Sequence, residues 1–272
     1  MKKLIIYSIL NVILGFMVFF GLKAHTQAKL YEEATTELVS YQDAPQQAAF
    51  QLERIAKSLL GDLYIDERRI MLDAVREKQE KAMAQAKLYT LYFMSLLALM
   101  LLSFFLVSLR AFTLFGALSA MVTLIFGLIT PILMVTIHTE VEYLGDIVLS
   151  FESKGVLGSI EKLFEGGDVL VALVILLFSV LVPVLKILSL LFVSVFMESK
   201  FAHNIVKFFK MIGKWSMVDV FVVAVFLVYL TANKGDVSRA EVEVGLYFFL
   251  AYVIVSMLVS ISADKMLHNL KE

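Results

Sequence analysis

Lys186 is the residue whose type and setting most strongly indicate chemistry. It lies within LFSVLVPVLKILSLLFVSVF, and no other charged residue occurs between Asp168 and Glu198. A lysine inside a membrane helix costs about 2.5–3.5 kcal/mol on insertion scales, so such residues usually serve a function. Snorkelling is the alternative. Lys186 lies roughly 15 Å from the nearer end of the run at about 1.5 Å per residue, and its side chain spans part of that distance.

Prolines accompany this lysine and a second apolar run. Pro183, three residues before Lys186, removes a backbone donor and is expected to free the carbonyl of Ser179 one turn back. A freed carbonyl and a serine hydroxyl near a buried cation predict a polar pocket, and a simple helix kink is the alternative. Pro131, next to Thr130, is expected to act in the same way in an earlier run.

Asp219 begins a further apolar run, in GKWSMVDVFVV. Trp215 is typical of an interfacial anchor, and Ser216 is a suitable cap for the helix that follows. Asp219 then lies near the helix N-terminus, where negative charge is favourable. It either stabilises this helix start or pairs with Lys186 or with a lysine of the preceding loop.

Most catalytic and cofactor chemistry has no signature in the chain. It contains no cysteine, which excludes disulfides, thiolate zinc sites and iron–sulfur clusters within it. His138 and Glu142 form only a weak metal pattern, because structural sites usually need four ligands. No metalloprotease, nucleotide-binding or serine-nucleophile motif is found. The sequence therefore predicts no enzyme, no cofactor and no metal site, and a net charge of -1 predicts no nucleic-acid partner.

Long apolar runs must position these residues. Apolar residues make up 60% of the 272-residue chain, against about 45–50% in average proteins. The runs are long enough to cross about 30 Å of hydrocarbon. We predict spans at 4–22, 89–109, 111–137, 169–196, 216–233 and 245–264. The expected fold class is an all-α integral membrane protein with about six transmembrane helices.

The distribution of lysine and arginine in the short loops predicts the orientation. It places the N- and C-termini in the cytoplasm of a bacterial inner membrane. The run 4–22 exceeds the roughly 7–15 residues of a signal-peptide core, which favours an uncleaved anchor.

The long segment 23–88 then lies outside the cytoplasm and is polar and helix-prone. Apolar residues recur at helical spacing in its first part, Pro45 should break it, and Asp66 is a plausible N-cap for a second helix. We expect a helical hairpin standing out of the membrane on the first two spans.

Two stretches together indicate a family. VALVILLFSVLVPVLKILSLLF is followed about twenty residues later by GKWSMVDVFVVAVFLVYL. This arrangement resembles the paraquat-inducible protein A family, whose pattern pairs P-x-x-K with W-S-M-x-D-V-F. The matching positions are Pro183, Lys186, Gly213, Trp215, Ser216, Met217, Asp219, Val220 and Phe221, and Arg110 and Pro131 also fit. The resemblance covers residues 107–266, so we expect an N-terminal hairpin unit, 1–106, and a four-helix unit, 107–272.

The resemblance implies an inner-membrane component of lipid trafficking between bacterial membranes. It implies a tetraspanin-like four-helix unit and a periplasmic partner of the mammalian-cell-entry (MCE) domain class. Some family members have two units and cysteine zinc ribbons, whereas this chain has one unit and no cysteine. The partner is therefore open, and a homodimer is one way to supply a second unit.

A lipid site needs an apolar lining and a cation for the phospholipid phosphate. We expect Lys186 to bind that phosphate as a point charge. Pro131 and Pro183 would open the helices around it, Asp219 would pair with a basic group in the empty state, and the hairpin would dock the periplasmic partner. Two alternatives stay open: a membrane-embedded sensor or regulatory protein with an extracytoplasmic helical module, and an ion-coupled small-solute carrier using Lys186 and Asp219.

Overall fold

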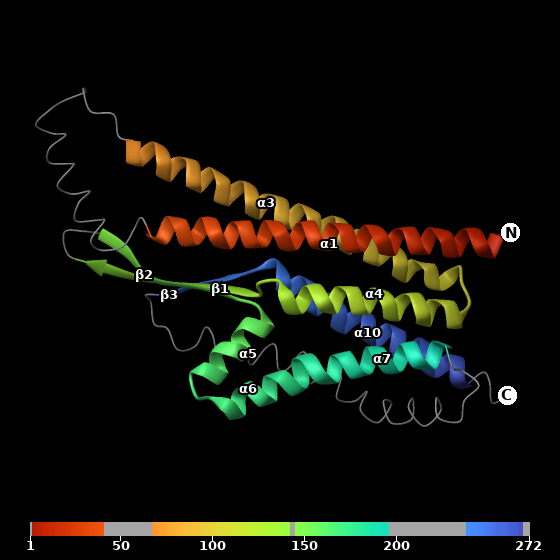
Figure 1. The fold of residues 1–272 in the computed structure, drawn as a ribbon. Helices are drawn as coiled ribbons and strands as arrows, with labels where there is room; N and C mark the ends of the chain where they lie inside the picture. The colour runs from red at the N-terminus through yellow and green to blue at the C-terminus, as the bar shows by residue number, and fades with distance from the viewer. Residues whose placement is uncertain (1, 41–66, 142–144, 196–237, 269–272) are drawn as a thin grey trace, which may run out of the picture.

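The structure, a computed structural model, describes residues 2–40, 67–141, 145–195 and 238–268 (Figure 1). Within these ranges, five helices are long and apolar enough to cross a membrane. The protein is thus an α-helical, multi-pass membrane protein, as predicted. The predicted span 216–233 lies outside the described residues, together with Trp215, Ser216 and Asp219.

The first two spans belong to very long helices. α1 (Lys2–Ser40) has 39 residues and α3 (Glu67–Leu102) has 36. They measure about 58 and 54 Å at about 1.5 Å per residue, against a hydrocarbon layer of about 30 Å. Each helix therefore continues far beyond its apolar part without a break, and the two lie side by side for much of their length (Figure 1).

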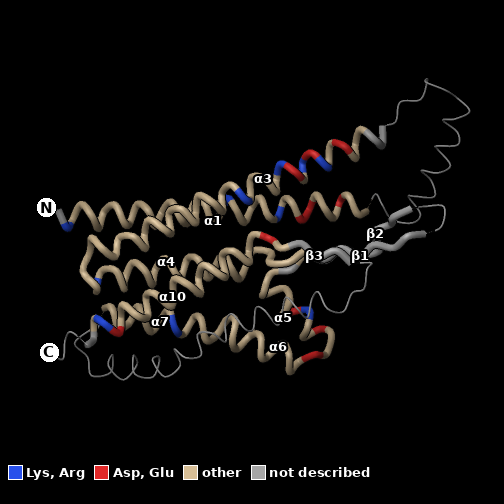
Figure 2. The backbone as a smooth tube through the Cα atoms, turned by 180° about the vertical axis from the view of Figure 1, so that it is seen from behind, with Lys and Arg blue, Asp and Glu red and all other residues tan. Residues whose placement is uncertain are grey.

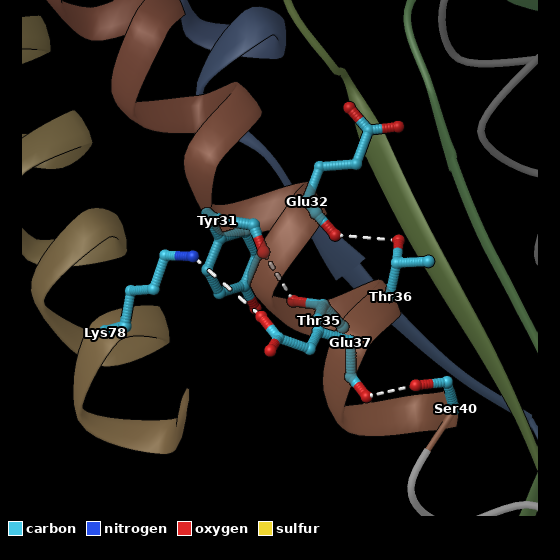
Figure 3. Close-up of polar contacts among 7 residues, drawn as sticks. All are labelled: Tyr31, Glu32, Thr35, Thr36, Glu37, Ser40 and Lys78. Atoms are coloured by element: carbon cyan, nitrogen blue, oxygen red, sulfur yellow. Dashed lines mark hydrogen bonds and ion pairs between the residues drawn. The ribbon is translucent and has the colours of Figure 1, made fainter. Parts of the chain in front are cut away.

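Small residues form the seam between α1 and α3. The buried alanines are Ala24, Ala28 and Ala34 of α1 and Ala82 and Ala86 of α3. Gln79 Nε2 donates to Thr35 Oγ1 at 2.8 Å, and Lys78 Nζ lies 3.8 Å from Glu37 Oε2. Figure 3 shows the ion pair crossing between the two helices, while threonine and serine hydroxyls of α1 bond back to their own helix. The seam allows close backbone approach, and the polar contacts fix its register outside the apolar part.

The third predicted span, 111–137, is too long. α4 (Leu109–Ile129) ends at Thr130, whose backbone is extended with ψ 143°. Pro131 causes this ending, because proline has no N–H to donate and disfavours helical backbone in the residue before it. The chain then continues as β1 (Leu133–Val141). Pro131 therefore ends the helix and does not kink a longer one.

A three-stranded antiparallel sheet follows, which the sequence did not predict. Its order is β2-β1-β3, with β2 at Gly145–Lys154 and β3 at Ser238–Val242. Leu133 of β1 pairs with Lys154 on one side and Val242 on the other. The sheet lies beyond the membrane helices, and Met134 at its base packs with Tyr31 and Ala82 of the hairpin. It is an addition to the helical bundle at one end, which we call the sheet end.

The predicted fourth span is found at the expected place as one helix, Val169–Val195, with a π-helical segment inside it. After β2 come α5 (Val156–Glu165) and α6 (Val169–Ile175), then a π-helical segment (Leu176–Leu181) and α7 (Val182–Val195). The last helix is α10 (Val244–His268). α1 begins and α10 ends at the end of the molecule opposite the sheet (Figure 1).

One core joins the hairpin to the remaining helices. Phe93 of α3, Phe126 of α4 and Phe248 of α10 pack together, with ring centroids 4.8 Å apart for Phe93 and Phe248. The Phe126 ring lies directly against Gly21 of α1, where any Cβ would overlap it. Charged residues gather on the outer parts of the long helices and towards the ends of the bundle, while most of its middle is uncharged (Figure 2).

Candidate functional site

Lys186 points into the bundle. Its side chain is 7% exposed, and Nζ donates to Ser256 Oγ of α10 at 3.1 Å. On the same helix, Leu185 is 56% exposed and Leu188 is 48% exposed, so α7 turns these two leucines outward and Lys186 inward. The ammonium group therefore ends on a neighbouring helix and not at the membrane surface, where snorkelling would place it.

The packing of α4 on α10 shows what else lies at this depth. The two helices are antiparallel, since Gly116 faces Val259 and Gly127 faces Phe249. Interpolating between these contacts places Ser119 at the level of Ser256. The same count places Thr123 beside Tyr252, one turn closer to the sheet. All four residues are fully or almost fully buried: Ser119, Thr123, Tyr252 and Ser256.

A contact between α4 and α7 shows which residues of these two helices lie at the same depth. Arg110 at the start of α4 donates from Nε to Ser194 O and from Nη2 to Val195 O, each at 3.0 Å. Both carbonyls belong to the last described residues of α7, so the contact fixes this part of α7 against the start of α4. Counting back along α7 and forward along α4 from this contact places Lys186 opposite Ser119. Since Ser119 is the middle residue of α4, Lys186 lies near the middle of the bundle.

Among the described residues, this layer contains the Lys186 ammonium and the hydroxyl groups of Ser119 and Ser256. Ser119 and Ser256 direct their own protons to backbone carbonyls, Gly116 O at 2.9 Å and Val253 O at 3.0 Å. Their oxygens therefore remain acceptors. A lysine ammonium carries three donors, and its bonds to phosphate or carboxylate oxygens are stronger than bonds between neutral groups. The described residues thus place one lysine ammonium and two hydroxyl oxygens at the same depth of the bundle.

The helix is irregular immediately before Lys186. The N–H of Val182 bonds to Leu177 O, five residues back, which is the π-helical pattern. Pro183 and Ser179 lie on the buried face that also carries Lys186. A whole turn is distorted here, rather than the single carbonyl expected from Pro183. Single π-turns inside α-helices occur frequently at functional sites.

Thr130 and Pro131 lie elsewhere, at the sheet end. Thr130 Oγ1 is 3.2 Å from His25 Nδ1, and Pro131 O accepts from the N–H of Gly245 at 2.8 Å. Gly245 and Ser256 are separated along α10 by about 16 Å at about 1.5 Å per residue. The structure therefore brings Pro183 and Ser179 to Lys186 but keeps Thr130 and Pro131 apart from it.

Sequence reasoning missed the hydroxyl residues around Lys186. Ser119, Thr123 and Ser256 stand singly in apolar runs, where small residues are equally suited to plain helix packing. Serine and threonine inside helices also bond to their own backbone, as these do, so their presence alone does not indicate a site. Only the alignment of three helices identifies them.

Comparison with known proteins identifies the family of the part of the chain that holds these helices. The family model described as Paraquat-inducible protein A matches residues 110–268, more than half of the chain, and this range contains α4, α7 and α10. A "Probable intermembrane transport protein" of Haemophilus influenzae is 29% identical over 109 residues, which are 38% of this chain and 26% of that protein. This chain thus matches about a quarter of that relative's length. No solved structure matches the chain. On the extent of the family match, the chain belongs to the paraquat-inducible protein A family.

Proposed function

We propose that this protein is an inner-membrane component of a system that moves lipid between bacterial membranes, and that it holds a phospholipid inside its helix bundle. The observation that carries the proposal is the position of Lys186, which is 7% exposed, central in the bundle and turned towards α10. The family and the intermembrane transport relative support a role in transport between membranes. Neither name specifies an enzymatic reaction, and we assign none.

The proposed contact is between the Lys186 ammonium and the phosphate of the headgroup. Burying a lysine costs free energy, and an anionic group bound to it offsets part of that cost. Ser119 and Ser256 lie at the same depth and supply further hydrogen-bonding groups. Between Lys186 and the Val195 end of α7, Ile187 and Leu190 are buried and apolar, and in this proposal acyl chains lie against them.

The hairpin has a separate proposed role. We assign residues 1–106 to a hairpin unit with 23–88 outside the membrane, and 107–272 to the four-helix unit. The lengths of α1 and α3 support this division, because both helices extend far past the hydrocarbon layer. In this proposal the extended part docks a periplasmic protein, such as one with an MCE domain, and the termini are cytoplasmic. Pairing of Asp219 with a basic group in the empty state, and a homodimer, remain proposals from the sequence.

The proposal is tested with a phospholipid that carries a photoreactive diazirine in its acyl chain. After irradiation in membranes, adducts are mapped on α7 by peptide mass spectrometry. Exposed positions such as Leu185 and Leu188 report bulk lipid, and buried positions such as Ile187 report lipid inside the bundle. We expect Lys186→Met to abolish inward adducts and to leave outward adducts unchanged.

The matched control is Lys162→Met, which removes an exposed lysine of α5 and should change neither set of adducts. Lys186→Arg keeps the charge and should retain part of the inward signal. If inward adducts persist at full strength in Lys186→Met, the lysine is not the headgroup site and the central part of the proposal fails.

A further inference from the structure

α5 has an apolar sector wider than the surface with which it packs on the bundle. Val156, Ser159 and Ile160 are buried. Leu157 and Phe164, two turns apart, flank this face and are 43% and 40% exposed. The opposite side carries the exposed charged residues Glu161, Lys162 and Glu165. A short helix with this division between apolar and charged sides is typical of one lying in a membrane interface.

The position of α5 fits such a location. Gly155, just before the helix, lies against the carbonyls of Leu128 and Thr130, where α4 ends. From there α5 runs across the long helices and not along them (Figure 1). Gly166 and Gly167 then reverse the chain. Gly167 has φ 87°, a conformation that glycine adopts without steric cost.

The exposed apolar surface continues past this turn. In α6, Leu170 is 77% exposed, Leu173 is 50% exposed and Val174 is 44% exposed. These residues belong to Val169–Val195, a candidate membrane span by its length and hydropathy, so their exposed side chains are suited to lipid contact. Phe164 lies only a few residues before that span begins. Because the exposed apolar side chains of α5 precede this candidate span, membrane lipid is the partner whose chemistry fits both surfaces.

We propose that α5 is an interfacial helix lying in the plane of the membrane. Leu157 and Phe164 are seated at the boundary between headgroups and acyl chains of the leaflet at the sheet end, and Glu161, Lys162 and Glu165 face water. α6 and the π-helical segment connect α5 to α7. The membrane contact of α5 therefore also positions the outer half of the span that carries Lys186. The lipid surface involved is distinct from the proposed site around Lys186 and does not depend on it.

The absence of cysteine makes a direct depth measurement possible. Single cysteines at Leu157, Phe164, Glu161 and Glu165 are labelled with an environment-sensitive fluorophore in the full-length protein, reconstituted in phosphatidylcholine–phosphatidylglycerol vesicles. Brominated phospholipids quench a fluorophore in the membrane, and aqueous iodide quenches one in water. We expect lipid quenching without iodide quenching at Leu157 and Phe164, and the reverse at Glu161 and Glu165. Leu170→Cys is the membrane reference.

Equal iodide quenching at Phe164 and Glu161 would overturn the proposal and would place α5 in water, with its apolar edge left for another partner. A measurement without label covers the case in which the fluorophore disturbs the helix. Phe164→Glu should accelerate amide hydrogen exchange in α5 in vesicles, and the control Glu165→Ala should not. Unchanged exchange in Phe164→Glu would also count against the anchor.

Discussion

Lys186 is held where its charge is expensive. The side chain is almost fully buried in the middle of an apolar bundle, and Ser256 accepts one of its hydrogen bonds. Replacing a buried charge by an apolar residue of similar volume is often neutral or stabilising, because the cost of desolvation disappears. If Lys186 serves lipid binding, replacing it by an apolar residue should leave the stability of the protein unchanged or raise it. If Lys186 is needed for folding, the same replacement should lower the stability.

We expect Lys186→Met to keep or raise the midpoint of thermal unfolding in detergent, although it removes lipid binding. Ser256→Ala should lower the free energy of unfolding by about 1 kcal/mol, because a buried donor loses its acceptor. Circular dichroism during heating checks both variants. A clear drop in midpoint for Lys186→Met would show that the lysine is needed for folding.

At the scale of elements, close backbone contact defines how α4 meets its neighbours. A Cβ on Gly127 would lie 2.9 Å from the backbone of Phe249 in α10. A Cβ on Gly245 would overlap the carbonyls of Thr130 and Pro131, where α10 begins beside the end of α4. These glycines set the spacing between α4 and α10, which brings Ser119 and Ser256 to one depth.

Gly127→Ala should therefore destabilise the protein by about 1–3 kcal/mol, because the obstructing atoms are backbone and cannot rotate away. Gly158→Ala in α5 is the matched control, since its Cβ would have nothing within 4 Å. That change should be neutral or stabilising by up to about 1 kcal/mol, as alanine favours helix over glycine. Chemical or thermal unfolding in detergent measures the difference, and equal stability of the two variants would contradict the close packing.

Pro183→Ala tests the cause of the π-helical segment in the fourth span. Alanine restores an N–H donor and should favour a regular α-helix in place of the π-helical turn at Leu176–Leu181. We expect slower amide hydrogen exchange across this turn and weaker inward lipid adducts at Ile187. Faster exchange would mean that the proline stabilises the segment and does not break it.

At the scale of the whole molecule, the two ends of the bundle differ in kind. The sheet, α5 and the extended parts of α1 and α3 lie at one end, and α1 begins and α10 ends at the other (Figure 1). The charges in the short loops predict that the sheet end faces the periplasm.

Single cysteines in the cysteine-free chain measure this orientation directly. With a membrane-impermeant thiol reagent on intact spheroplasts, Lys78→Cys and Lys162→Cys should be labelled. Lys3→Cys and Lys265→Cys should react only after the membrane is permeabilised, because all four positions are exposed but lie at opposite ends. The reverse labelling pattern would show that the orientation is inverted and that the proposed docking site lies in the cytoplasm.

The sequence by itself determined the class of the protein and the spans at both ends of the chain, and it singled out Lys186, which the structure buries. These features depend on local information, since helix hydrogen bonds join residues four apart and hydropathy is a property of each run. The predicted N-cap Asp66 lies outside the described residues, and α3 is described from Glu67 onward. The family pattern also lies in two continuous stretches.

Tertiary structure decided the rest. The strand that replaces the end of the span 111–137 is stabilised by pairing with β2 and β3, and β3 lies about a hundred residues away in the chain. The direction of Lys186 depends on which face of α7 packs on α4 and α10, which a uniformly apolar helix does not reveal. Ser119 and Ser256 can be assigned to one layer only because the antiparallel packing of α4 and α10 brings them to the same depth. Side-chain direction and strand pairing depend on contacts between residues far apart in the sequence. The hydropathy of each run does not contain that information.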